Sequence, residues 1–189
     1  MNRKKLLLIS FALVALAQLF VPWQMIRNQA GIAETGTDFK FKIKNNRSGA
    51  SIRGRYIWLR FDEDHFKITN KKEWTGITNA YALFNKDSTG FAKIESVTKD
   101  IPENSTDWVQ VKVIQNREDS MAPGLIYPFN KYYIEDTNHK TIDSILRNGL
   151  NDSLKSSYLK IHIKENQFLI DDLLLDGVPL EKMIRDLKN

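Results

Sequence analysis

The sequence predicts a mainly β (α+β) protein, in which a single N-terminal transmembrane helix precedes one β-rich, sandwich- or barrel-like domain with one or two short helices. The first observation is an uncharged, largely apolar run of 21 residues that begins with Leu6 and ends with Ile26; about 20 such residues cross a bilayer as a helix. The second is a series of segments after residue 35 in which apolar and polar residues alternate, as in half-buried strands. We therefore divide the chain into an anchor, residues 1–35, and an extracytoplasmic β-rich domain, residues 36–189.

The charges around the apolar run predict its orientation. Arg3, Lys4 and Lys5 directly precede it, and basic flanks stay on the cytoplasmic side of a membrane. Trp23 lies near the opposite end, where interfacial aromatic residues gather. We expect a single-pass protein of the bacterial cytoplasmic (inner) membrane, held in the lipid bilayer through residues 6–26, with its N-terminus inside and its domain in the periplasm.

A cleaved signal peptide is the alternative, because residues 15–17 form a small-x-small site after a short apolar core. The apolar run continues to Ile26, so cleavage after Ala17 would leave an apolar segment exposed at the new N-terminus. This favours a retained helix. We expect the helix to continue through residues 27–34 and to stop at Gly36.

Composition excludes several classes of function. The net charge is +5, but Arg3, Lys4 and Lys5 supply three of the 28 basic residues, which leaves 25 basic and 23 acidic residues, a net charge of +2, in the rest of the chain. No long block of one sign occurs there, which argues against nucleic-acid binding. The chain has no cysteine, which excludes disulfides and thiolate zinc sites.

Eight segments carry strand-like patterns. In the first, Phe39, Phe41 and Ile43 alternate with lysines, so that the apolar side chains face a core and the lysines face water. Residues 53–61 are rich in β-branched and aromatic side chains on both parities, which indicates a strand covered on both faces. The predicted strands are 39–44, 53–61, 80–84, 91–97, 108–114, 125–134, 158–164 and 168–175.

Turns and helices separate these strands. Residues 85–90 join two strands as a hairpin, and Asp176-Gly177 predicts a tight structural turn. Residues 137–148 change to the spacing of a helix. Pro179 opens a last short helix with an apolar stripe.

Two groups of aromatic and charged residues indicate a binding surface. Tyrosine and tryptophan offer large contact areas together with a polar group, which suits a groove or a protein interface. The alternative is that the tyrosines pack in a β core with their hydroxyls at its rim. The candidate binding residues are Arg53, Gly54, Tyr56, Trp58, Leu59, Tyr127, Tyr132, Tyr133 and Glu135.

No segment carries a catalytic or metal-binding pattern that assigns a site. His65, His139 and His162 lie far apart in the sequence, without the close spacing of metal ligands. The acidic turn at residues 62–64 lacks the alternate spacing and the glycine of a calcium loop, so we interpret it as a solvated turn. We expect no catalytic residue, no metal and no cofactor.

Residues 120–125, Ser-Met-Ala-Pro-Gly-Leu, resemble the nucleophile box of type I signal peptidases. Those enzymes are membrane-anchored and use a serine nucleophile with a lysine base, so the resemblance implies a serine-lysine peptidase centred on Ser120. The sequence departs from that pattern in three ways. Ser120 lies far beyond the anchor, Gly124 replaces the usual threonine, and no later stretch resembles a lysine box.

A short strand motif gives a second resemblance. Gly54, Tyr56 and Leu59 match the pattern G-D-Y-x-x-L-x-Y, whereas Arg55 replaces its aspartate and Phe61 its last tyrosine. On these residues the chain resembles the GDYXXLXY family of bacterial membrane-anchored proteins, and similar segments follow in order along nearly the whole chain. They are Val21-Pro22, Met25-Ile26, Phe39-Lys40-Phe41, Tyr127-Pro128-Phe129, Tyr132-Tyr133 with Glu135, and Asp176-Gly177-Val178-Pro179.

This family resemblance implies a retained anchor and an extracytoplasmic β domain without an established activity, in a protein that accompanies multi-span membrane proteins. Together with the apolar run and the aromatic residues, it predicts a non-enzymatic, membrane-anchored module that is an accessory or binding partner of another membrane protein. Two alternatives stay open. One is the serine-lysine peptidase, and the other is a domain that binds a small ligand or an envelope polymer between its sheets.

Overall fold

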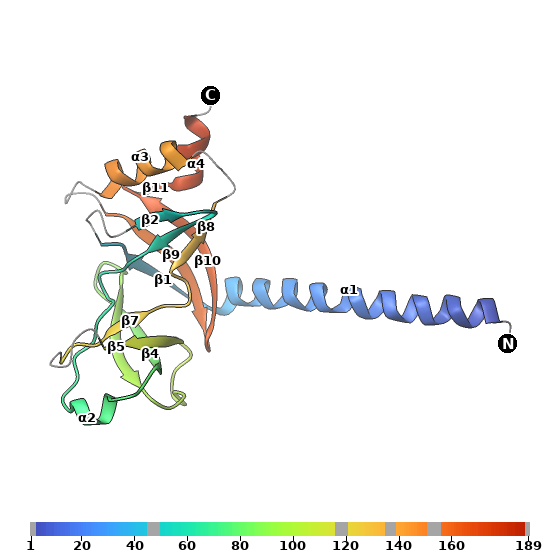
Figure 1. Ribbon diagram of the computed structural model, residues 1–189, viewed down its shortest axis with the longest axis horizontal. Coiled ribbons are helices and arrows are strands. Elements are labelled where there is room, and N and C mark those ends of the chain that lie inside the picture. Colours follow the sequence, from blue (N-terminus) through green and yellow to red (C-terminus); the bar gives the residue numbers. More distant parts are fainter. Residues whose placement is uncertain (1–2, 45–49, 116–120, 135–138, 151–155, 188–189) are drawn as a thin grey trace.

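A computed structural model describes residues 3–44, 50–115, 121–134, 139–150 and 156–187 of the chain. It consists of one long helix, α1 (Arg3–Thr35), and one β-rich domain from whose side this helix projects (Figure 1). The predictions of a mainly β fold and of an apolar N-terminal helix are confirmed.

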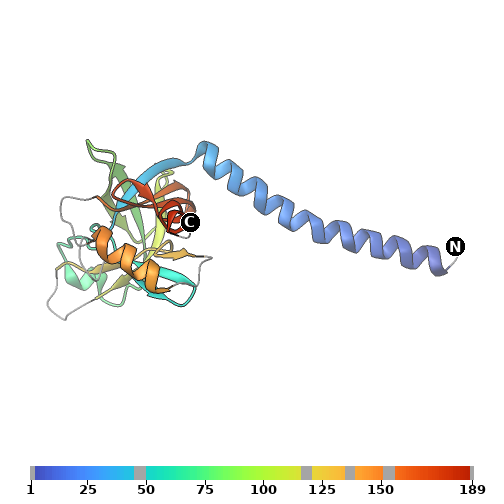
Figure 2. The same ribbon diagram turned by 90° about the horizontal axis from the view of Figure 1, so that it is seen from above.

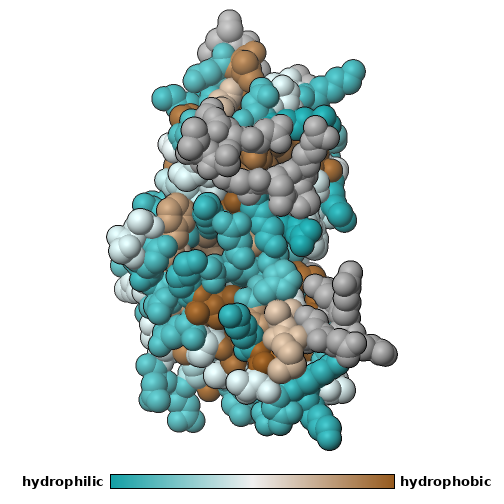
Figure 3. Space-filling view, turned by 90° about the vertical axis from the view of Figure 1, so that its left-hand side faces the viewer, coloured by the Kyte–Doolittle hydropathy of each residue, from teal (hydrophilic) through white to brown (hydrophobic). Residues whose placement is uncertain are grey.

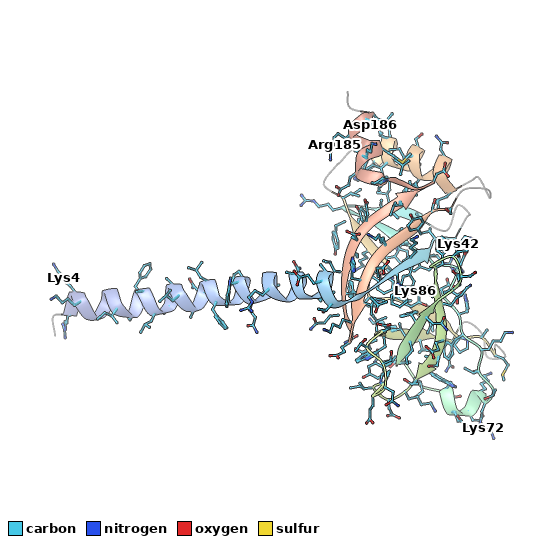
Figure 4. All side chains as sticks on the ribbon, turned by 180° about the vertical axis from the view of Figure 1, so that it is seen from behind. Lys4, Lys42, Lys72, Lys86, Arg185 and Asp186 are labelled. Carbon is cyan, nitrogen blue, oxygen red and sulfur yellow. The ribbon has the colours of Figure 1, made fainter. Side chains whose placement is uncertain are left out.

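The helix α1 is continuous, and many of its described apolar side chains are exposed. Phe11 and Leu19 are 73% and 67% exposed, and the helix is long and apolar enough to cross a membrane. It ends before Gly36, as expected, and the Gly36 N–H donates a hydrogen bond to the Ile32 carbonyl at 2.9 Å. Figure 4 labels Lys4 at the end of α1 farthest from the domain.

The described residues of the domain form three antiparallel sheets, with the strand orders β1-β9-β10-β11, β2-β3-β8 and β5-β4-β6-β7. Two isolated bridges link β1 and the residue after it to the other sheets. Ile43 pairs with Phe61, which follows β3, and Lys40 pairs with Phe91, which precedes β5. The strands are β1 (Thr37–Lys42), β2 (Ala50–Arg53), β3 (Tyr56–Leu59), β4 (Asn79–Lys86), β5 (Ala92–Thr98), β6 (Trp108–Ile114), β7 (Gly124–Ile126), β8 (Lys131–Tyr133), β9 (Tyr158–Lys164), β10 (Gln167–Leu175) and β11 (Val178–Pro179).

Aromatic side chains fill much of the space between the sheets. Phe41 is buried, and its ring centroid lies 4.8 Å from that of Phe129 and 5.6 Å from those of Phe61 and Tyr127. Rings at such distances contribute edge-to-face contacts in addition to their buried apolar area. Phe39 is buried on the same side of β1, so the predicted alternation of this strand is confirmed.

Two of the predicted strands are each divided in two. Residues 53–61 belong to a hairpin of β2 and β3 that begins at residue 50. The chain reverses at Gly54, which adopts a positive φ of 64°. Residues 125–134 supply β7 to one sheet and β8 to another. Pro128 lies between them and has no N–H for a ladder. The prediction of a single strand was wrong in both segments.

Three short helices, rather than one or two, occur in the described residues: α2 (Lys71–Trp74), α3 (His139–Leu150) and α4 (Leu180–Asp186). The single turn of α2 is capped by the Asn70 side chain, which accepts a hydrogen bond from the Lys72 N–H, and it is too short for a periodic signal. α3 and α4 lie together at one end of the domain (Figures 1 and 2). The predicted turn is confirmed, because Asp176 and Gly177, with φ of 55° and 76°, connect β10 to β11.

The acidic turn is partly buried, so its interpretation as a solvated turn was wrong at Asp64. The Asp64 carboxylate lies 2.8 Å from Lys44 Nζ and 3.8 Å from the Arg60 guanidinium, and it is hydrogen-bonded to His65 Nδ1. The Asp64 carbonyl accepts a hydrogen bond from the Leu125 N–H at 2.7 Å. Since Leu125 belongs to β7, which is distant in sequence, only the folded chain covers this carboxylate.

Candidate binding surface

The outer side of the β2-β3-β8 sheet gathers the predicted aromatic residues that are accessible. Tyr56 faces Tyr133 across the β3–β8 ladder, and Trp58 faces Lys131. Arg53 joins them from β2, opposite Tyr56. We call these five residues the aromatic face.

The aromatic face is held together by contacts between rings and cations. The Arg53 guanidinium lies 5.3 Å from the centre of the Trp58 ring. Lys131 Nζ lies 5.1 Å from the Tyr56 ring and 5.9 Å from the Trp58 ring, and the Tyr56 and Tyr133 centroids are 5.9 Å apart. Cations over ring faces at these distances are attracted by the ring quadrupole, so the side chains restrict one another.

The two cations of the aromatic face have no acidic partner within the described part of the chain. Among the described residues, no carboxylate forms an ion pair with Arg53 or Lys131. Arg53 is exposed and Tyr133 is 68% exposed. The face therefore presents aromatic area and positive charge to a ligand, without an ion pair to any carboxylate that the structure describes.

A hollow adjoins the aromatic face, with a volume of about 620 Å³. Its lining includes Lys131 and Tyr133 on β8 with the neighbouring Trp58, and Phe168 and Ile170 on β10, together with residues of β4, β6 and the segment from β7 to β8. We call it the β8–β10 groove. The sequence did not indicate Phe168 or Ile170 as site residues, because their pattern is that of an ordinary strand.

Three of the candidate binding residues point into the core instead. Leu59, Tyr127 and Tyr132 are buried, which agrees with the alternative that tyrosines pack the β core. Burial raises the pKa of Tyr127 well above its usual value, and its hydroxyl donates to the backbone carbonyl of Glu63. Burial, with Glu181 nearby, also raises the pKa of Tyr132. These residues support the surface rather than form it.

The remaining predicted residues fall into separate places. Gly54 forms the β2–β3 turn. Glu135 and Ser120 lie outside the described residues, so the serine-lysine peptidase stays a prediction. Within the described ranges, no group of three or more His, Cys, Asp or Glu side chains is placed to hold a metal ion.

Comparisons of the chain with protein-family models, with curated proteins and with solved structures found no match. The aromatic face, the groove and the apolar helix are the features of the chain that bear on its function.

Proposed function

We propose that this chain is a single-pass membrane module that binds another membrane protein through the aromatic face. The observation that carries the proposal is a group of accessible rings and cations on a domain attached to an exposed apolar helix, with no acidic partner for these cations among the residues that the structure describes. Aromatic and arginine side chains dominate the binding energy of protein interfaces. The proposed role is accessory and non-enzymatic.

The length of α1 supports a partner in the same membrane. If residues 6–26 cross the bilayer, nine helical residues remain before Gly36, which at 1.5 Å per residue hold the domain about 13 Å from the apolar core of the membrane. Ile32 is buried at the end of α1, and Lys164 Nζ donates to the Thr35 hydroxyl at 2.9 Å. In this proposal the domain is held close to the bilayer. The face opposite α1 carries mainly hydrophilic side chains (Figure 3).

The orientation in this proposal follows from the basic flank at residues 3–5, with the N-terminus in the cytoplasm and the domain in the periplasm. The resemblance to the GDYXXLXY family supports the same arrangement. Its motif falls on the β2–β3 hairpin, where Tyr56 contributes to the aromatic face and Leu59 to the core.

Capture of the partner from cells tests the proposal. Tagged full-length protein is crosslinked in cells, extracted in mild detergent and analysed by mass spectrometry. We expect one membrane protein in near-stoichiometric amount, and we expect Arg53→Ala or Tyr56→Ala to reduce its yield severalfold, because each removes a central interface contact.

Matched variants elsewhere in the domain control this experiment. Lys99 lies 5.4 Å from the Trp74 ring, a cation–ring pair like that of Arg53 and Trp58, and Tyr81 is half-buried beside another ring. Lys99→Ala and Tyr81→Ala should leave capture unchanged. Capture that is equal for all four variants, with unchanged folding, would contradict the proposal.

The groove favours a second candidate function, the binding of a small ligand or an envelope polymer. Its volume of about 620 Å³ is within the range of small-molecule sites, and its lining by Trp58, Tyr133 and Phe168 is aromatic, as in many such sites. A protein that is recovered alone after crosslinking would direct attention to this candidate.

A further inference from the structure

We infer that the β8–β10 groove accepts an extended segment of the partner as an additional β-strand, with apolar side chains directed into the groove and acidic side chains toward its lysines. The inference rests on the proposed function and specifies how the partner would bind. It is drawn from the free edges of two strands, from the groove lining and from the place of the groove near α1.

The first strand edge belongs to β8. Its only strand partner among the described residues is β3. The Leu59 N–H donates to the Asn130 carbonyl, and the Ile134 N–H donates to the Arg55 carbonyl. Along an antiparallel ladder, hydrogen-bonded residue pairs alternate with pairs that are not hydrogen-bonded. Lys131 and Tyr133 belong to the pairs that are not hydrogen-bonded. Their backbone N–H and C=O groups therefore point away from β3. These groups are available to a further strand.

The second strand edge belongs to β10. This strand pairs with β9 along its length, but on its other side it pairs with β11 only at Leu174 and Leu175. The described part of the chain therefore leaves the preceding residues of β10 without a strand on that side. The Tyr132 side chain of β8 is buried, and its hydroxyl donates a hydrogen bond to the Glu181 carboxylate on α4 at 3.4 Å. In the described residues, no backbone ladder joins β8 to β10.

The groove lining indicates the side chains that such a segment would carry. Phe168 and Ile170 offer apolar surface, and both charged residues of the lining, Lys112 and Lys131, are cations. Successive side chains of a strand point to opposite sides. A segment in which apolar and acidic residues alternate would place one set against the apolar surface and the other near the lysines.

The position of the groove suits a segment close to the membrane. Phe168 pairs with Ile163 on β9, and Ile163 pairs with Thr37 on β1, two residues after α1 ends. Neighbouring strands are about 4.8 Å apart, so the Phe168 end of the groove lies about 10 Å from the exit of α1. A periplasmic segment that directly follows a transmembrane helix of the partner would reach it.

Peptide binding to purified full-length protein in mild detergent tests the inference. The probe is a fluorescein-labelled, capped heptapeptide that alternates glutamate and valine, and fluorescence anisotropy gives its Kd. We expect saturable binding that is weakened about tenfold by Lys131→Glu. Lys40→Glu, on β1, should not change it. A heptapeptide with lysine for glutamate should bind at least about tenfold more weakly.

Backbone methylation distinguishes strand addition from contact by side chains alone. N-methylation of alternate residues removes the peptide N–H groups on one edge, so the methylated heptapeptide should lose binding. Equal binding of both peptides would overturn the inference, as would the absence of binding by the unmethylated one. Displacement of the peptide by dextran sulfate but not by excess unlabelled peptide would assign the groove to a polymer, and self-association abolished by Lys131→Glu would assign it to a second copy of the chain.

The two proposals fail in different ways. If crosslinking captures a partner that depends on Arg53 while no peptide binds, the strand-addition inference alone is wrong. If the heptapeptide binds as expected while Arg53→Ala and Tyr56→Ala leave partner capture unchanged, the proposed role of the aromatic face is wrong.

Discussion

Two lysines at the end of β1 illustrate how much the setting of a single side chain matters. Lys42 and Lys44 are two residues apart, and each forms an ion pair with an aspartate of the same acidic turn. The Lys42–Asp62 pair spans 3.6 Å with both side chains more than 40% exposed, whereas the Lys44–Asp64 pair spans 2.8 Å with exposures of 20% and 10%. Water screens the charges of the exposed Lys42–Asp62 pair but has little access to the Lys44–Asp64 pair. The two ion pairs should therefore contribute differently to stability.

We predict that Lys44→Met lowers the free energy of unfolding by about 1–3 kcal/mol, because it leaves the buried Asp64 carboxylate with less compensation. Lys42→Met is the matched control and should change it by no more than about 1 kcal/mol. Denaturant unfolding of the full-length protein in detergent, followed by tryptophan fluorescence, measures both. Similar losses for the two variants would show that burial of Asp64 does not decide the effect.

The sequence identified individual elements best where one side of a strand faces water. The alternation of residues 39–44 and of 158–164 predicted β1 and β9, because only one face of each strand is apolar. For residues 53–61 the prediction of one strand with both faces buried was wrong, because these residues belong to two strands of a hairpin. A tight turn that leaves the hydrophobic pattern unbroken cannot be located by periodicity.

The junction between α1 and β1 depends on the glycine at position 36. A Cβ atom there would lie 2.5 Å from the Ile32 carbonyl oxygen and 3.2 Å from that of Ile163. Both are backbone atoms, so neither can move without displacing α1 or β9. The absence of a side chain therefore allows the helix to end directly against the sheet.

We predict that Gly36→Ala destabilises the protein by about 1–3 kcal/mol, the usual cost of forcing atoms into a packed site. Gly31→Ala is the control, because apart from the adjoining residues and the backbone of its own helix no atom lies within 4 Å of its added Cβ, and alanine in a helix should raise stability by up to about 1 kcal/mol. Thermal unfolding of the full-length variants compares them. A Gly36→Ala protein as stable as Gly31→Ala would mean that the junction adjusts freely.

At the scale of the whole molecule, the sequence indicated only part of the candidate surface. It identified Arg53, Tyr56 and Trp58, which are neighbours in the chain, and also Tyr133. It did not identify Phe168, because the contact of β10 with the groove is created by the order of strands in two different sheets. It also could not tell which tyrosines point outward, since β8 begins a new alternation after the interruption at Pro128. Non-local pairing of strands, which a single sequence does not encode in any local pattern, accounts for the first failure, and the broken alternation accounts for the second.

The orientation of the whole chain determines whether a partner can reach the groove, and the absence of cysteine makes it measurable. We predict that Asp100→Cys, at an exposed position of the domain, reacts with a membrane-impermeant maleimide in intact spheroplasts. Asn2→Cys, which keeps all three basic residues of the flank, should react only after lysis, because the flank stays in the cytoplasm. Protection of Asp100→Cys in intact spheroplasts would contradict a periplasmic domain. A mature protein that has lost the cysteine at position 2 and the mass of residues 1–17 would instead establish cleavage after Ala17, and the groove would then act without a membrane anchor.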